Sequence, residues 1–138
     1  MKRHMAPPPP PCPPLCAILL DDDLFMAELI GDMLTRFGMK EVYLETNAQH
    51  ALKTILEHQP DLLICDLAIP DMDGIEFMKS IALHGFQGGI IVLSGMSDAV
   101  LKAAQSLALA QGLRVLGAFK KPLSPVDLQL ALSKLSMD

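Results

Sequence analysis

Apolar runs of strand length alternate with segments of helical periodicity along most of this chain. The five runs lie at residues 16–20, 41–45, 62–66, 89–93 and 114–119. Between them, and after the last, apolar residues recur every three or four positions, as on the buried face of an amphipathic helix. The third and fourth runs have few polar residues, which is typical of strands covered on both faces of a parallel sheet. Five strands and five helices in strict alternation predict a doubly wound α/β domain.

Glycine, proline and serine residues mark the expected helix ends. Gly38 stands where the first helix should end, and Pro60 follows the second. Ser97 and Ser124 are expected N-caps of the fourth and fifth helices, with Pro125 at the first helical position of the fifth. The residues at the expected helix ends therefore agree with the helices predicted from the periodicity.

Size and charge narrow the class of protein. The chain has 138 residues, and 51% of them are hydrophobic, which suits one soluble domain. A net charge of -5 offers no basic surface for nucleic acid, and no apolar stretch is long enough to span a bilayer. Three cysteines without framework spacing and no apolar signal core predict a reducing, cytoplasmic location without structural disulfides.

The first fourteen residues, MKRHMAPPPPPCPP, differ in composition from the rest. Their proline run favours extended backbone and cannot join a helix or a central strand. Residues 1–14 are therefore expected to be a disordered leader, with a ligand for a PxxP-reading domain as the alternative. The folded domain is expected over residues 15–138.

Acidic residues stand at the carboxyl ends of two strands. Asp21, Asp22 and Asp23 directly follow the first apolar run, and Asp66 ends the third. Carboxylates crowded at the ends of hydrophobic strands repel one another unless a cation lies between them. Because ligands of doubly wound sheets bind at the carboxyl ends of the strands, these residues are expected to meet at one edge.

The same edge should receive two further polar residues, Ser94 after the fourth run and Lys121 after the fifth. The glycine-rich turns of dinucleotide and P-loop sites are absent, and the aspartates do not have calcium-loop spacing. A Mg²⁺ site remains, with Asp22 and Asp66 as direct ligands and Asp21 holding a metal-bound water. Asp66 could then attack a phosphoryl donor while Lys121 and Ser94 contact the phosphoryl oxygens.

Four segments, LLDDD, ICDLAIPDMDG, VLSG and FKKPL, resemble in order and spacing the receiver domain of two-component response regulators. The resemblance extends from residue 15 to about residue 137. It implies a flavodoxin-like (βα)5 sandwich, with five parallel strands in the order 2-1-3-4-5 and helices on both faces. It also implies a switch that phosphorylates and slowly dephosphorylates itself, and not an enzyme that turns over a substrate.

Carried over by residue, the resemblance makes Asp66 the phosphoacceptor and Asp21 and Asp22 the acidic pair that binds Mg²⁺. The backbone carbonyl of Ala68 would be a further metal ligand. A histidine kinase or a phosphotransfer protein would donate the phosphoryl group. A direct interaction with nucleic acid or with a membrane is not expected.

Ser94 resembles the switch hydroxyl of the family, and Lys121 resembles the lysine that precedes a cis-proline, here Pro122. The sequence leaves open whether Lys120 exchanges roles with Lys121. The resemblance implies an output through the face of the fourth helix, fifth strand and fifth helix, toward an output domain or partner, and leaves a homodimer open.

Two departures from the family pattern are expected to matter. Many receivers have an aromatic residue three positions before the lysine, where this chain has Ala118, and Phe119 should face the other side of the sheet. Ala68 and Met96 occupy positions that influence the hydrolytic water, and neither side chain can orient one. We therefore expect a phosphorylated aspartate that hydrolyses slowly.

The remaining aspartates of the motifs have structural interpretations. Asp23 is expected to be the N-cap of the first helix. Asp71 and Asp73, with Gly74, are expected to shape the turn and cap the third helix.

Two alternative functions remain open beside that of a phosphoacceptor. The first is a degenerate receiver that serves as a phosphorylation-independent dimerisation or docking module, favoured by the missing aromatic residue. The second is an aspartyl-phosphate phosphohydrolase, disfavoured because Ala68 replaces the second aspartate of such enzymes. The segment from Gly112 to Pro122 also resembles receivers that precede EAL-type cyclic-di-GMP phosphodiesterase domains.

Overall fold

The computed structural model describes residues 15–95 and 97–135, and the expected leader lies outside these ranges. The main sheet is formed by β1 (Cys16–Leu20), β2 (Glu41–Glu45), β3 (Leu62–Asp66), β6 (Gly89–Ser94) and β7 (Arg114–Lys120). The helices are α1 (Leu24–Arg36), α2 (Ala48–His58), α3 (Gly74–Leu83), α4 (Asp98–Ala110) and α5 (Pro125–Ser133). Every strand and helix expected from the periodicity is present.

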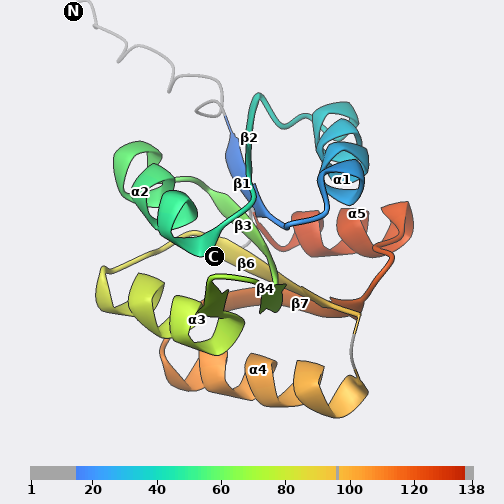
Figure 1. The fold of residues 1–138 in the computed structure, drawn as a ribbon. Coiled ribbons are helices and arrows are strands. Elements are labelled where there is room, and N and C mark those ends of the chain that lie inside the picture. The colour runs from blue at the N-terminus through green and yellow to red at the C-terminus, as the bar shows by residue number, and fades with distance from the viewer. Residues whose placement is uncertain (1–14, 96, 136–138) are drawn as a thin grey trace, which may run out of the picture.

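The five strands are parallel and lie in the order β2-β1-β3-β6-β7 (Figure 1). Counted along the main sheet alone, this is the predicted order 2-1-3-4-5, so the doubly wound fold is confirmed. The order reverses at β1, and the carboxyl ends of β1 and β3 are therefore neighbours. Ligands bind beside such a reversal because the connecting helices leave on opposite faces of the sheet.

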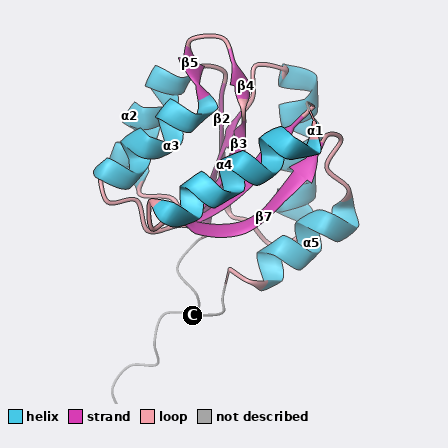
Figure 2. Cartoon of the chain, turned by 90° about the horizontal axis from the view of Figure 1, so that it is seen from below, coloured by secondary structure: helices cyan, strands magenta, loops and turns pink. Residues whose placement is uncertain are grey.

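Alternate side chains of each central strand enter two separate cores. Ile18 and Leu20 of β1 pack with α2, α3 and α4, whereas Ala17 and Leu19 pack with α1 and α5. Two views of the chain show the same three-layer arrangement (Figures 1 and 2). All residues of β1, β3 and β6 are buried, as expected for strands covered on both faces. Within the described ranges, no helix combines the length and hydropathy needed to cross a bilayer.

The helix ends follow the predicted capping chemistry. The side chains of Asp23, Ser97 and Ser124 each accept a hydrogen bond from a backbone N–H in the first turn of α1, α4 and α5. Gly38 follows α1 with a φ of 103°, a left-handed conformation that favours glycine. Each of these positions was predicted from the sequence.

A short hairpin between β3 and α3 was not predicted. Its strands, β4 (Ala68–Ile69) and β5 (Met72–Asp73), pair antiparallel, with Ala68 opposite Asp73. Strands of two residues are too short to show an alternating pattern, so the sequence contains little signal for them. The hairpin matters because it begins two residues after Asp66.

The edge strand β7 contains a bulge and is tethered at its start. Ile90 pairs with Val115 but Ile91 pairs with Gly117, so Leu116 is the extra residue. The guanidinium of Arg114 donates hydrogen bonds to the carbonyls of Lys134 and Leu135, at 2.6 and 2.8 Å, beyond the end of α5. These bonds fix the start of β7 against the last helix.

We expect the central strand β3 to dominate the stability of the fold. Leu63 is fully buried there, and Leu63→Ala should lower the free energy of unfolding by about 2–5 kcal/mol because it leaves a cavity. Leu83, 87% exposed at the end of α3, supplies the matched control, and Leu83→Ala should stay within about 0.5 kcal/mol of wild type. Urea denaturation measures both, and equal losses would contradict the packing described here.

Candidate functional site

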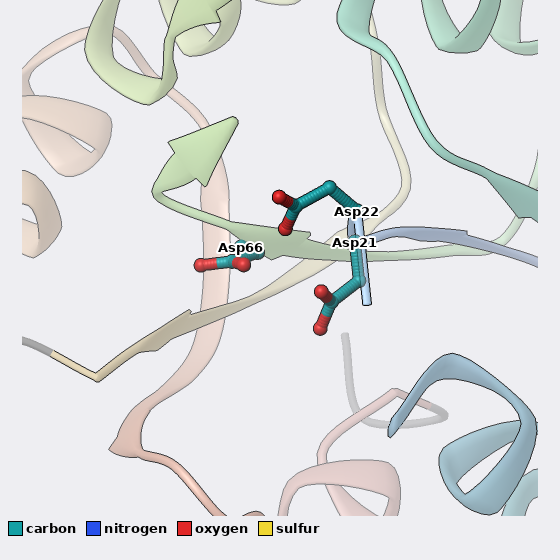
Figure 3. A group of neighbouring side chains, drawn as sticks. All are labelled: Asp21, Asp22 and Asp66. Atoms are coloured by element: carbon teal, nitrogen blue, oxygen red, sulfur yellow. The ribbon is translucent and has the colours of Figure 1, made fainter. Parts of the chain in front are cut away.

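Three carboxylates from the ends of β1 and β3 meet at one edge of the sheet (Figure 3). Asp21 and Asp66 are each only 3% exposed, whereas Asp22 is exposed. An oxygen from each lies within 4.8 Å of the others. The convergence predicted for Asp21, Asp22 and Asp66 is therefore present in the structure.

Lys121 provides the positive charge of the site. Its Nζ atom lies 2.9 Å from Asp66 Oδ2 and 2.9 Å from Asp21 Oδ2, so one ammonium serves two buried carboxylates. Lys120 is exposed and lies 3.9 Å from Asp98 on α4. Of the two lysines, Lys121 therefore contacts the carboxylates at the strand ends, whereas Lys120 pairs with Asp98. The Lys121–Pro122 peptide bond is cis, as the resemblance implied.

Backbone hydrogen bonds join the carboxyl ends of β3, β6 and β7 at the same edge. Ser94 ends β6 and is fully buried, and its carbonyl accepts the N–H of Lys121 at 2.9 Å. The N–H of Leu67 donates to the carbonyl of Leu93 at 3.0 Å. The residues that directly follow β3 and β7 are thus bonded to the end of β6. The four predicted residues Asp21, Asp66, Ser94 and Lys121 are all buried or half-buried there.

The pKa values of Asp66 and Lys121 both lie above their ordinary values. Burial raises the pKa of Asp66, and hydrogen bonds from Lys121 and from the N–H of Ala68 offset only part of this effect. Burial alone would lower the pKa of Lys121, but its bonds to Asp66 and Asp21 outweigh burial. Burial thus disfavours the ionised form of Asp66, whereas the ion pairs favour the charged form of Lys121.

The donor set fits a hard divalent cation. Three carboxylates face one ammonium, so the cluster keeps an excess of negative charge that a cation would neutralise. Both Asp21 oxygens already have contacts, because Oδ1 accepts the N–H of Asp23 at 2.9 Å and Oδ2 pairs with Lys121. Asp22 is exposed and remains accessible. Such a set suits Mg²⁺, which keeps several waters and takes one or two carboxylates.

The side of the sheet on which the aromatic residue lies agrees with the prediction. Ala118 pairs with Val92 and packs in the core beneath α4, whereas Phe119 pairs with Leu93 and packs in the core beneath α1 and α5. The position beneath α4 that is often aromatic in receivers therefore holds only a methyl group.

The structure corrects one interpretation of the sequence. Asp73 is the N-cap of α3, as expected, and accepts the N–H of Ile75 at 2.9 Å. Asp71 does not cap α3. Its carboxylate accepts the N–H groups of Ala48 and Gln49, at 2.8 and 3.2 Å, at the start of α2. The cause is the β4–β5 hairpin, which turns Asp71 toward the neighbouring helix.

Comparison with known proteins identifies the family. The sequence model of the response regulator receiver domain family matches residues 17–133, and the chain belongs to this family. It is 34% identical over 115 residues to the chemotaxis protein CheY of Bacillus subtilis, covering 78% of this chain and 96% of that protein. The CheY of Thermotoga maritima is 29% identical over 119 residues, covering 86% and 95% of the two chains.

Solved structures agree with this assignment. The crystal structure of a response regulator from Colwellia psychrerythraea superposes with a TM-score of 0.77 at 29% identity, covering 91% of this chain and all of that one. The chain is thus a receiver domain with the flavodoxin-like fold, a phosphoacceptor module of two-component signalling.

The raised pKa of Asp66 predicts a pH-dependent gain in stability for Asp66→Asn in Mg²⁺-free buffer. Because the folded pKa lies above the unfolded one, the contribution of Asp66 to stability is fully present below the unfolded pKa and is lost as the pH rises through the folded pKa. Asp66→Asn should therefore be more stable than wild type at neutral pH, with the gain vanishing below about pH 4.

Urea denaturation across this pH range measures the gain. The exposed Asp32 of α1 provides the control, since Asp32→Asn should show no such gain. An Asp66→Asn variant that is less stable than wild type at neutral pH would contradict the prediction.

Proposed function

We propose that Asp66 accepts a phosphoryl group from a histidine kinase or a phosphotransfer protein. The observation that carries this proposal is the single ammonium of Lys121 shared by Asp66 and Asp21, with exposed Asp22 beside them. Asp66 ends β3 beside the exposed Asp22, so a donor would approach from the carboxyl edge of the sheet. The raised Asp66 pKa leaves the group nucleophilic once it is ionised.

Asp22, Asp66 and the Ala68 carbonyl would bind Mg²⁺ directly, and Asp21 would hold a metal-bound water. The spacing of the three carboxylates and the occupied oxygens of Asp21 support this division. When bound, Mg²⁺ would neutralise the surplus carboxylate charge and polarise the phosphoryl oxygens.

The residues of the chain perform the remaining work. An Asp66 carboxylate oxygen forms a bond to phosphorus while the bond from phosphorus to the donor nitrogen breaks, and the electron pair leaves with that nitrogen. Lys121, now on Asp66 Oδ2, would contact a phosphoryl oxygen and offset the added charge. The Ser94 hydroxyl, at the end of the adjacent strand, would bind a second oxygen. The domain would then be a switch and not a turnover enzyme.

The output would use the face formed by α4, β7 and α5, toward an output domain or a partner. Ser94 and Lys121 lie at the carboxyl ends of β6 and β7, and α4 and α5 begin four positions later, at Asp98 and Pro125. A contact of either residue with a phosphoryl group would therefore act near the start of one of these helices. Because Ala118 replaces the aromatic residue beneath α4, the shift would come from backbone and helix movement.

Labelling with acetyl phosphate tests the phosphoacceptor directly. Wild type should take up one phosphoryl group per chain in the presence of Mg²⁺ and none in a chelator. Asp66→Asn should abolish uptake, and Asp32→Asn should match wild type. Mass spectrometry of the intact protein measures all four samples. A folded wild type that binds Mg²⁺ but takes no label would contradict the proposal and leave the docking module as the function.

The lifetime of the phosphoryl group tests the expected slow hydrolysis. Ala68 is exposed and presents a methyl group, which cannot orient water. Ala68→Asn adds an amide that can, and should shorten the half-life of the phosphorylated protein by about one order of magnitude. Ala68→Val is the control, because it adds bulk without a hydrogen-bonding group. A wild-type half-life as short as that of Ala68→Asn would refute the expectation. Met96, the other residue invoked, lies outside the described ranges.

A further inference from the structure

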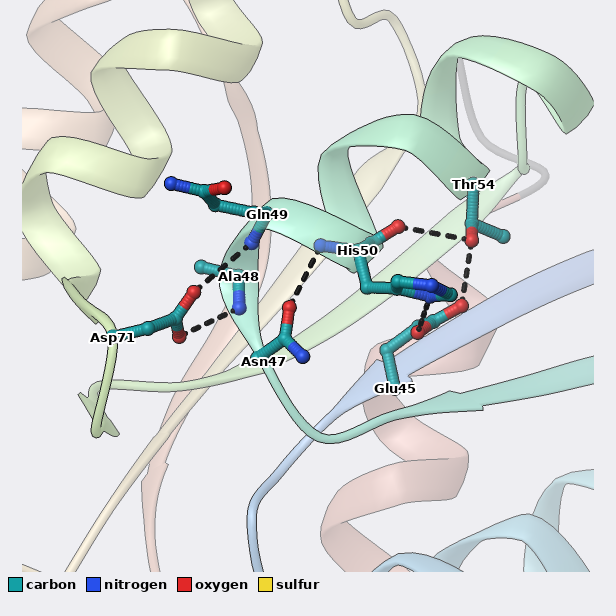
Figure 4. Close-up of polar contacts among 7 residues, drawn as sticks. All are labelled: Glu45, Asn47, Ala48, Gln49, His50, Thr54 and Asp71. Carbon is teal, nitrogen blue, oxygen red and sulfur yellow. Dashed lines mark hydrogen bonds and ion pairs between the residues drawn. The ribbon is translucent and has the colours of Figure 1, made fainter.

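The first three N–H groups of α2 are satisfied from two different places (Figure 4). Asn47, the N-cap, accepts the N–H of His50 at 2.8 Å. Asp71 accepts those of Ala48 and Gln49, which lie 23 and 22 residues earlier in the chain. Helix N-termini leave such donors without partners inside the helix, and α2 has no acidic residue in its own first turn. A residue of the β4–β5 hairpin therefore supplies the missing negative charge.

The hairpin that carries Asp71 also carries the segment beside the phosphoacceptor. Asp71 lies in the turn between β4 and β5, and β4 contains Ala68. The N–H of Ala68 donates to Asp66 Oδ1 at 3.0 Å. A short path of bonded groups thus leads from α2 through Asp71 and the hairpin to the Asp66 carboxylate.

The far end of this path is firmly anchored. Glu45 ends β2, and its Oε1 lies 3.1 Å from His50 Nδ1 while its Oε2 accepts the Thr54 hydroxyl at 2.6 Å (Figure 4). The Glu45 carbonyl also accepts the N–H of Asp21 at 3.0 Å. The start of α2 is therefore bonded to the end of β2, and Asp71 bonds the hairpin to the same part of α2.

The hairpin needs such a support because its own pairing is short. Two-residue strands are marginal alone, and Ala68 and Asp71 are both exposed. Ile69 is buried in the core, and Asp73 fixes the other end to α3. The N–H groups of Ala48 and Gln49 lower the pKa of Asp71, so its carboxylate stays charged at neutral pH.

We propose that Asp71 is a positioning residue of the phosphoacceptor site: by binding the start of α2, it holds the β4–β5 hairpin so that Ala68 presents its backbone to Asp66 and to Mg²⁺. The effect on Mg²⁺ rests on the proposed function. The hydrogen bonds from Ala48 and Gln49 to Asp71, which tether the hairpin to α2, do not depend on it. Asp71 contacts neither donor nor metal and acts through the backbone of Ala68.

Asp71 and Asn47 both cap the start of α2, so comparing their variants distinguishes a positioning role from a loss of helix stability. Asp71→Ala removes two hydrogen bonds that tether the hairpin, whereas Asn47→Ala removes a bond that stays within the start of α2. Titration calorimetry with Mg²⁺ should show a dissociation constant about tenfold higher for Asp71→Ala and less than about twofold higher for Asn47→Ala. Asp71→Asn keeps one acceptor oxygen and should fall between them.

Amide hydrogen exchange gives a readout that needs neither metal nor phosphoryl transfer. In Asp71→Ala, exchange should speed up at Ala48 and Gln49 and also at Ala68, on the far side of the hairpin. In Asn47→Ala, it should speed up at His50 and leave Ala68 unchanged.

The outcomes distinguish the two proposals. Equal Mg²⁺ dissociation constants for Asp71→Ala and Asn47→Ala, or unchanged exchange at Ala68 in Asp71→Ala, would overturn the positioning role. A wild type that binds Mg²⁺ but accepts no phosphoryl group would overturn the phosphoacceptor function, while a selective effect of Asp71→Ala on Mg²⁺ affinity would still support the tether.

Discussion

The ammonium of Lys121, shared by Asp66 and Asp21, is the interaction on which the site depends. Each carboxylate ends or follows a strand that is buried on both faces, where an unpaired charge would be costly. Lys121, directly after the third strand β7, offsets part of that cost for both. The two ion pairs of Lys121 also connect the end of β7, at the edge of the sheet, to the ends of β1 and β3 at its centre.

This arrangement leaves the site balanced between two requirements. The lysine makes the buried carboxylates tolerable, but it does not cancel their charge, so the cluster keeps the excess of negative charge that favours a cation. The stability of a receiver and the readiness of its site are therefore opposed, as is common where charged groups are gathered for function.

Much of the fold and of the site could be predicted because both follow from the same periodicity. The buried strands are continuous apolar runs in the sequence. Because parallel strands end at the same edge of the sheet, the residues directly after them must meet there. Asp71 could not be assigned, because its partners lie 22 and 23 residues away and only the folded hairpin brings them together. Lys120 and Lys121 could not be distinguished either, since the pairing of β7 decides which of them reaches the carboxylates.

The bulge at Leu116 has a consequence for how the edge strand keeps its register. β7 is fixed at its start by Arg114 on the carbonyls after α5, and just after its end by Lys121 on the carboxylates. A strand held at both ends cannot slide to absorb a length mismatch, so the surplus residue is displaced from the ladder between Val115 and Gly117. The bulge thus takes up the extra length of β7. The same strand can then place Arg114 against the end of α5 and Lys121 against the carboxylates.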